Sequence, residues 1–524
     1  MPLNKINNFI TKDKFLLFII FLVTFFLNKY YASLGVFPID TFLHFDTGYR
    51  VLNGEYPIKD YWILKGIFVD YLEALFFYLL GVSWKTHVFH SSFINGIMTM
   101  ATYFVLRSFK FKKTYAFLYS FFFGILAYPP SGTPFVDHHA AFLSLLGIYS
   151  FILALNTQKN LYWMIMPIFF GLSFFSKQVP SSFIIIPMSI IIIFYSITKK
   201  EWNFIKYSFI GSLIFISLVL MIGAAQGIHL DKFITQYIIY PQTIGGSRFN
   251  NLSFSLSGLA GNYKFIYLAL FSLIFLNIKN LIKNKNYIKE KNFYIFLAIL
   301  LYSLCLMLHQ TLTKNQIFIY FLCPLLFAFV KIYLNNELNK FKTTTFIIIL
   351  VLSLSITIKY HLRFNEDRKF HELSNVNFNL AKNANLIDKK LTGLNWITPN
   401  FKNNPEDEIS FLKYTIEILK EDKRKKMVLT NYLFFSTILN EKLHAPSRTF
   451  TLDGISFPLK GSKYYPIYKK HFLEIIKNNK IQVIYFISSD YTVPDRFVYD
   501  YLDKGCINEH SFTNQLKKFE IEKC

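Results

Sequence analysis

Acidic side chains are scarce in the first 360 residues, and most of them gather in two stretches. Seven of the twelve Asp and Glu residues before residue 361 lie there. The first stretch, FPIDTFLHFDTGYRVLNGEYPIKDYWILKGIFVDYLEALFFYLLG, holds six of them: Asp40, Asp46, Glu55, Asp60, Asp70 and Glu73. The second, YPPSGTPFVDHH, holds Asp137 beside His138 and His139. A carboxylate near a low-dielectric surface can act as a general base toward a hydroxyl, so these stretches predict a site of acid–base chemistry.

Long apolar runs predict the elements that position these residues. The chain is 53% hydrophobic and 19% aromatic, which is typical of a polytopic membrane protein. Because a helical span needs about 20 apolar residues, we expect an α-helical membrane domain at 1–361 with about eleven spans. The spans are expected near 15–35, 88–106, 114–128, 140–156, 161–177, 181–197, 207–224, 265–278, 292–308, 316–330 and 343–360.

Basic residues orient these spans. The segments expected on the same side of the membrane as the N-terminus hold 19 Lys and Arg in 59 residues. The segments expected on the opposite side hold 10 in 123. Since basic loops stay in the cytoplasm, we expect both acidic stretches on the outer face of a bacterial inner (plasma) membrane, with the N-terminus inside. The net charge of +24 is then explained by inner loops that face anionic lipid, and nucleic acid is not expected as a partner.

The outer side limits the chemistry. Because no nucleotide is available there, a sugar linked to a lipid phosphate is the natural activated donor: its lipid lies in the bilayer and its phosphate at the edge. Lys or Arg beside the carboxylates can stabilise the departing phosphate. No Asp or Glu lies deep inside a predicted span, which argues against an ion-coupled transporter.

The first acidic stretch resembles the first outer loop of the GT-C superfamily of integral-membrane glycosyltransferases. The branch with protein O-mannosyltransferases and lipid A aminoarabinose transferases is the most similar. The shared features are Asp40 at the end of the first span, the aromatic segment TFLHFDTGYRVL, Gly54 in GEYPIKDYW, and ILKGIFVDYLEALFFYLLG before the second span. Asp137 in VDHHAAFLSLL and the Lys-Gln pair in GLSFFSKQVP match two further family elements. The resemblance covers residues 15–200 and extends beyond them only by topology.

This resemblance implies roles for individual residues. Asp40 is the catalytic base or organises it, and Asp137 is the second acid of the site. Lys65 contacts the donor phosphate, and Lys177 is a second candidate for that contact. The family often has paired acids at the first position, whereas Thr41 follows Asp40 here, so either Asp46 compensates or Asp46 is itself the base. The family's common proline after the lysine is replaced by Gly66.

Several of these residues also have a structural interpretation. Asp137 precedes a predicted helix and could be its N-cap. Asp60 is either a substrate contact, a turn residue, or an ion-pair partner of Lys59 or Arg50; Arg50 is also a candidate substrate contact. His138 and His139 point about 100° apart on a helix, which favours separate contacts with phosphate or acceptor over a shared metal, although a divalent cation at the carboxylates stays possible. Lys177 could be an interfacial anchor.

The tail at 362–524 has the pattern of a small periplasmic α/β domain. DEISFLKYTIEILKED and YPIYKKHFLEIIKNN have helical spacing, and MVLT and IQVIYFI read as buried strands. Cys506 and Cys524 are candidates for a disulfide in an oxidising compartment, whereas Cys305 and Cys323 fall in spans. The Gly- and Ser-rich segment 225–264 is expected to be a mobile loop, either a lid or a plain connector.

Taken together, the sequence predicts an inverting glycosyltransferase. The donor is a polyprenyl-phosphate sugar, and the acceptor is the hydroxyl of a lipid-linked or surface glycan, or of a protein. The alternatives are a transporter or flippase, a ligase or polymerase for lipid-linked glycans, and a non-catalytic scaffold.

Overall fold

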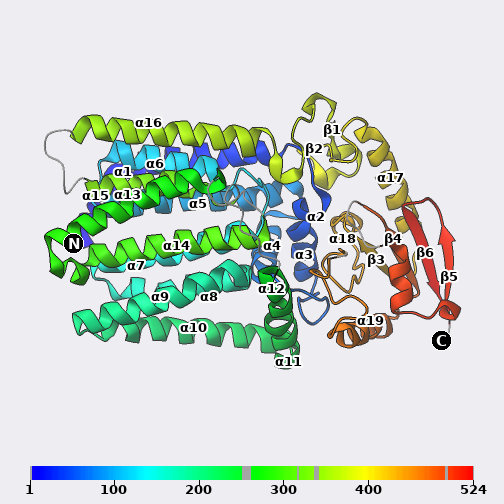
Figure 1. Ribbon diagram of the computed structural model, residues 1–524. Helices are drawn as coiled ribbons and strands as arrows, with labels where there is room; N and C mark the ends of the chain where they lie inside the picture. Colours follow the sequence, from blue (N-terminus) through cyan, green and yellow to red (C-terminus); the bar gives the residue numbers. More distant parts are fainter. Residues whose placement is uncertain are drawn as a thin grey trace. The chain divides into compact units, whose positions relative to one another are not determined.

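The computed structural model describes residues 3–250, 261–314, 318–334, 342–451, 453–489 and 494–522 (Figure 1). The chain divides into two compact units, each built from separate segments. The first, which we call the helical unit, comprises Met1–Ala32, Ser91–Leu220 and Asn251–Phe370. The second, the mixed unit, comprises Ser33–His90, Met221–Asn250 and His371–Cys524.

The two units do not match the predicted division of the chain into domains at 1–361 and 362–524. The last change of unit, between Phe370 and His371, lies close to that predicted boundary. The segments 33–90 and 221–250, however, belong to the same unit as the tail. The acidic stretch that begins at Phe37 is therefore part of the mixed unit, together with the C-terminal sheet.

Helices dominate the helical unit, and its long helices lie roughly parallel (Figure 1). Trp84 to His90 of α5 and the last residues of α10 are counted with the mixed unit. The helices are α1 (Leu3–Ala32), α5 (Trp84–Ser108), α6 (Lys113–Leu126), α7 (Val136–Thr157), α8 (Asn160–Ser176), α9 (Gln178–Lys199), α10 (Asn203–Ala225), α13 (Asn262–Lys283), α14 (Lys291–Thr313), α15 (Leu322–Leu334) and α16 (Lys342–His361).

A helix lies at each predicted span, but not all of these helices can cross a bilayer by themselves. Seven are long and apolar enough, and the count rises to eight if α4 (Ile67–Leu80) and α5, bent by 119°, form one broken span. The helices α6, α8 and α15 have 14, 17 and 13 residues, fewer than the roughly 20 that a span needs. The structure is therefore that of a multi-pass membrane protein with seven or eight candidate spans, and the expected number of about eleven stays a prediction.

The ends of the helices fall into two groups, and contacts link the ends within each group. This is expected of a chain that crosses a membrane repeatedly in alternating directions. Where α5 ends and α6 starts, Asp13 of α1 pairs with Arg107 at 2.9 Å and with Lys113 at 2.5 Å. Where α14 starts and α7 ends, Lys291 donates to Asn156. The opposite ends have their own contacts, among them Asn28 to the carbonyl of Gly132 and Arg368 to the carbonyl of Pro129.

Burial separates central helices from peripheral ones. In α7, 83% of the span is buried, whereas in α10 the share is 6%. The outward side chains of α10 are large and apolar, including Phe209, Leu213, Ile216 and Leu220. A helix that is apolar all round and exposed is stable only in a lipid environment, so α10 presents its surface to the bilayer.

The mixed unit contains short helices and a four-stranded sheet. Its sheet has the order β3-β4-β6-β5, with β3 (Lys426–Thr430) parallel to β4 (Val483–Ile487) and β6 (Leu516–Ile521) antiparallel to β4 and to β5 (Ile507–Ser511). A separate pair joins β1 (Lys382–Asn383) to β2 (Asn395–Trp396). The α-helices are α2 (Pro38–Thr41), α3 (Leu43–Leu52), α4, α11 (Leu230–Phe233), α12 (Tyr240–Asn250), α17 (Pro405–Glu421), α18 (Phe435–Leu439) and α19 (Tyr465–Asn479).

The two helices and two strands expected in the tail are confirmed. Both predicted strands are buried along their whole length, although β3 is at the edge of the sheet. The hairpin of β5 and β6 was not predicted; its burial pattern is irregular and most of β5 is exposed. A strand that is buried on neither face lacks the apolar alternation on which such a prediction depends.

The expected mobile loop at 225–264 was wrong for most of its length. Residues 230–250 form a continuous helical run through α11, the π-helix η1 (Ile234–Ile239) and α12; residues 251–260 lie outside the described part. The run is held by contacts within the mixed unit. Gln236 donates to the carbonyl of Ile58 at 3.1 Å, and the Tyr240 ring packs edge-on against Trp62. Tertiary packing thus overrides the low helix propensity of its two glycines.

The cysteines fall into two groups. Cys305 and Cys323 are thiols in α14 and α15, as expected of residues in spans. Cys506, at the end of a short 3₁₀ helix, is disulfide-bonded, while Cys524 lies outside the described residues.

Gly48 sets how closely α3 packs on α4. A Cβ at this position would lie 2.8 Å from the Cβ of Glu73, whose carboxylate is itself held by two histidines. Because this side chain cannot move away, Gly48→Ala is expected to destabilise the protein by about 2 kcal/mol, measured as a lower apparent melting temperature in detergent. Gly223→Ala in α10 is the control: nothing lies within 4 Å of its added methyl group, so an unchanged or higher melting temperature is expected there. Equal effects would contradict this interpretation.

Candidate functional site

A buried carboxylate joins the first acidic stretch to the tail within the mixed unit. Asp70 of α4 is inaccessible to solvent, and its Oδ1 accepts from Arg448 at 3.0 Å, from Thr47 at 2.5 Å and lies 2.7 Å from His44 Nδ1. Arg448 also donates to the backbone carbonyl of Lys65. A buried charge is tolerated only when it is paired and hydrogen-bonded, so this network fixes α3 and α4 against the loop between residues 439 and 465 that carries Arg448.

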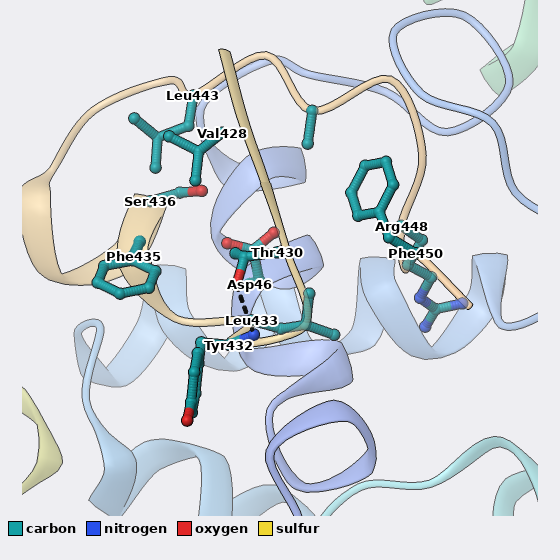
Figure 2. A pocket seen from close by; sticks show the side chains of 11 residues that line it. Asp46, Val428, Thr430, Tyr432, Leu433, Phe435, Ser436, Leu443, Arg448 and Phe450 are labelled. Carbon is teal, nitrogen blue, oxygen red and sulfur yellow. Dashed lines mark hydrogen bonds between the residues drawn. The ribbon is translucent and has the colours of Figure 1, made fainter. Parts of the chain in front are cut away.

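Asp46 lies in a small cavity beside this network. The carboxylate is buried, at 7% exposure. Burial raises the pKa of Asp46, although Arg50 and a hydrogen bond from Ser436 act in the opposite direction. The cavity has a volume of about 20 Å³, which is room for about one water molecule. Figure 2 shows the side chains around it: Asp46, Val428, Thr430, Tyr432, Leu433, Phe435, Ser436, Leu443, Ala445, Arg448 and Phe450.

Arg50, which was predicted to contact the substrate, forms its contacts with other residues of the protein. Its Nε donates to Glu55 at 3.1 Å, its Nη2 donates to the carbonyl of Ala445 at 2.9 Å, and its guanidinium stacks over Tyr61. Burial on its own would raise the pKa of Glu55, but Arg50 and His444 outweigh it and lower that pKa. Arg50 therefore helps to hold the first acidic stretch to the tail.

Asp40 lies on a single helical turn with a defined backbone. In α2 the backbone N–H of Asp40 donates to Phe37 O at 3.1 Å, and the N–H of Phe37 donates to Thr41 Oγ1 at 2.9 Å. The Asp40 side chain is half-buried, in contrast to the buried Asp46. Of these two candidate bases, Asp40 is thus the one with access from outside the protein.

Glu73 supports this turn through a histidine. Its two carboxylate oxygens lie 2.7 Å from His87 Nδ1 and 2.5 Å from His90 Nδ1. The other ring nitrogen of His87 lies 3.1 Å from the carbonyl of Thr41, next to Asp40. All three side chains are fully buried. The chain Glu73–His87–Thr41 therefore fixes the position of the turn that carries Asp40.

Two other residues of the first stretch have local roles. Asp60 accepts a hydrogen bond from the backbone N–H of Tyr56 at 2.7 Å, which is the turn arrangement considered as one of its alternatives. Lys65 is half-buried and precedes α4, and its backbone carbonyl is the acceptor for Arg448. These contacts set the loop conformation and leave the predicted phosphate role of Lys65 as a hypothesis.

In the helical unit, Asp137 forms a buried ionic cluster. Its Oδ1 lies 2.7 Å from Lys177 Nζ and 3.6 Å from His309 Nε2, and Asp137 is 5% exposed. The N-cap of α7 is Phe135, so the alternative that Asp137 caps this helix was wrong. Lys177, at the junction of α8 and α9, is also no interfacial anchor that reaches outward, because it is buried against Asp137. The cluster ties α7, α14 and this junction together.

His138 and His139 share a partner. His138 stacks on the Tyr128 ring at 4.6 Å, and its Nδ1 lies 3.1 Å from Ser131 Oγ. His139 Nδ1 lies 2.7 Å from the hydroxyl of Tyr128. Both histidines are buried. Within the described ranges, no group of three or more His, Cys, Asp or Glu residues has the geometry to hold a metal ion.

The predicted residues thus fall into two sets. The mixed unit holds Asp40, Asp46, Arg50, Asp60 and Lys65, and the helical unit holds Asp137, His138, His139 and Lys177. Sequence reasoning missed Arg448, His87 and His309 as members of these clusters. His87 and His309 gave a weak signal because they lie at the ends of apolar runs. Arg448 gave none, since it is one of many basic residues in the tail.

Comparison with models of known protein families and with curated proteins found no match for this chain. The site must therefore be interpreted from its own geometry.

The Asp137–Lys177 pair has a clear energetic consequence. Lys177→Gln removes the ammonium that lies 2.7 Å from the buried carboxylate of Asp137, so we expect a loss of about 3 kcal/mol in stability. The double variant Asp137→Asn/Lys177→Gln removes both charges and is expected to recover most of that loss, measured by thermal unfolding in detergent. Full activity in the double variant would show that the pair is structural only; lost activity with recovered stability would show a functional role.

His87 and His90 form a matched pair for testing the support of Asp40. Each bonds one oxygen of the same buried carboxylate, so His87→Gln and His90→Gln are expected to lower stability by similar amounts, about 1–3 kcal/mol. Only His87 also contacts Thr41 by a hydrogen bond in the described structure. We therefore expect the larger loss of activity in His87→Gln. Equal losses in the two variants would contradict a positioning role.

Proposed function

We propose that this protein is an integral-membrane glycosyltransferase that uses a polyprenyl-phosphate-linked sugar on the outer face of the inner membrane. The acceptor is the hydroxyl of a lipid-linked or surface glycan, or of a protein. This proposal includes membership of the GT-C class and about eleven membrane passes, three of them by helices shorter than a usual span.

The observation that carries the proposal is that Asp40 is partly exposed and lies on a turn of fixed position. Asp40 is half-buried on a turn held by backbone hydrogen bonds, whereas Asp46, Asp70 and Glu73 of the same unit are buried. A general base must reach the proton of a hydroxyl, so access and a fixed position both matter. The helices α3 and α4, which follow Asp40, also lie where the family resemblance expects helices in the first outer loop.

In the proposed reaction, Asp40 is the general base. The acceptor hydroxyl gives its proton to the Asp40 carboxylate as its oxygen attacks the anomeric carbon. The bond between that carbon and the phosphate oxygen breaks, and polyprenyl phosphate leaves with the bonding electron pair. Attack from the face opposite the leaving group inverts the anomeric centre. Lys65 is the proposed contact of the leaving phosphate, because a cation there offsets the charge that develops.

Asp40→Asn tests the proposed base. Removal of a general base lowers turnover by about 10²–10⁴-fold, so the sugar should disappear from its glycan while the lipid-linked donor accumulates. The measurement is mass spectrometry of glycolipids and polyprenyl-phosphate sugars from wild type, deletion, and deletion complemented with each variant.

Asp46→Asn is the matched control for this experiment. Burial already favours the neutral form of Asp46, so its amide analogue is expected to retain turnover within about tenfold. If Asp46→Asn abolishes transfer while Asp40→Asn does not, the roles of these two acids are reversed. If neither strain differs from wild type and the deletion accumulates no lipid-linked sugar, the transferase proposal is wrong.

A further inference from the structure

A second polar cleft lies in the helical unit, at the ends of the helices opposite to those near Asp137. It has a volume of about 380 Å³, within the usual range for small-molecule sites. Its walls come from the end of α5 and the following turn, the end of α7, the start of α14 and the end of α15. The lining residues are Ser108, Phe109, Lys110, Phe111, Asn156, Lys291, Asn292, Ile332 and Tyr333.

The charged side chains that line this cleft are both cationic. Lys291 Nζ donates to Asn156 Oδ1 at 2.9 Å, which uses one of the three N–H groups of the ammonium. Lys110 lies on an exposed left-handed turn after α5, at φ +59°. Among the described residues that line the cleft, none is acidic. The nearby Glu290 side chain accepts from Asn284 at 3.3 Å.

The polar and apolar parts of the wall have different roles. Asn156 Nδ2 is held by Ser108 Oγ at 3.1 Å, and the Tyr333 hydroxyl donates to the carbonyl of Asn292 at 2.6 Å. These bonds fix the wall before any ligand arrives. The rings of Phe109 and Phe111 and the side chain of Ile332 supply an apolar surface beside the lysines. A ligand that fits both parts carries an anionic head and an apolar body.

Backbone electrostatics alone would not select an anion here. The last turns of α5 and α7 place carbonyl groups of partial negative charge at the cleft. The first turn of α14 places N–H groups of partial positive charge there, and the side chain of the N-cap residue Glu290 does not bond to them. These effects oppose one another. The two lysines therefore decide the sign of the potential in the cleft.

We propose that this cleft binds the phosphate headgroup of an anionic phospholipid of the cytoplasmic leaflet. Lys110 and Lys291 contact the phosphate, and Phe109, Phe111 and Ile332 contact the start of the acyl chains. The basic helix ends that surround the cleft are the ones predicted to face the cytoplasm, where anionic lipid is the abundant phosphate at the interface. Basic pockets between helices on this side are a recurrent form of lipid site. The proposal does not depend on the glycosyltransferase activity.

Native mass spectrometry of the full chain tests this site. The purified protein is titrated in detergent with phosphatidylglycerol and, separately, with phosphatidylcholine. Wild type is expected to retain phosphatidylglycerol more tightly. Since each lysine near anionic lipid contributes about fivefold, Lys110→Gln/Lys291→Gln should weaken this retention by about 30-fold. Lys110→Arg/Lys291→Arg keeps both charges and should retain the lipid, which guards against a folding defect in the Gln variant.

Two controls separate the site from its alternatives. Lys199→Gln/Lys200→Gln removes two exposed lysines at the end of α9, on the same predicted side, and should leave retention unchanged. An equal loss there would show only general surface charge and would overturn the site. Inorganic phosphate is the other probe: if it binds as tightly as the lipid and in the same lysine-dependent way, the ligand is a soluble phosphate and the lipid assignment is wrong.

Discussion

Pairing of carboxylates that are out of contact with water is the constraint on which the rest of the structure depends. Asp13 is neutralised by Arg107 and Lys113, Asp137 by Lys177, and Asp70 by Arg448. Each cation comes from a different part of the chain than its acid. An unpaired charge in such surroundings costs several kcal/mol, so each pair requires its two segments to come together. Long-range packing in each unit is fixed at these points.

Pairing also divides the acids of the first acidic stretch by role. Asp70, Glu73 and Glu55 have partners that hold helices, loops and tail together in the mixed unit. Asp46 is buried beside a small cavity with room for about one water molecule. Asp40 differs, because its backbone is fixed by neighbours while its side chain keeps access to the outside. Asp60 is half-buried as well, but it accepts the backbone N–H of Tyr56 in a local turn, so the acids of this stretch differ both in burial and in partners.

The two ends of the helical unit show different electrostatic designs. At one end, Asp137, Lys177 and His309 form a compact buried cluster with its charges paired. At the other, Lys110 and Lys291 line an open cleft to which no acidic side chain of the described residues contributes. A paired cluster favours a fixed geometry, whereas unneutralised cations at a membrane surface favour an anionic lipid. The same residue types therefore support structure in one place and ligand binding in another.

The sequence alone determined the helical membrane class, the positions of the long helices and the strands β3 and β4 of the tail. These depend on apolar runs and local periodicity, which can be read along the chain. It also identified the acidic stretch that contains Asp40. It did not determine which helices are long enough to span, or that 230–250 is helical. The partners Arg448, His87 and His309 also came only from the tertiary structure. Those features depend on contacts between segments far apart in the chain, such as Asp70 with Arg448 and Asp137 with Lys177. Only the folded protein decides which acids are buried and which stay partly exposed, because burial is a property of packing and not of local sequence.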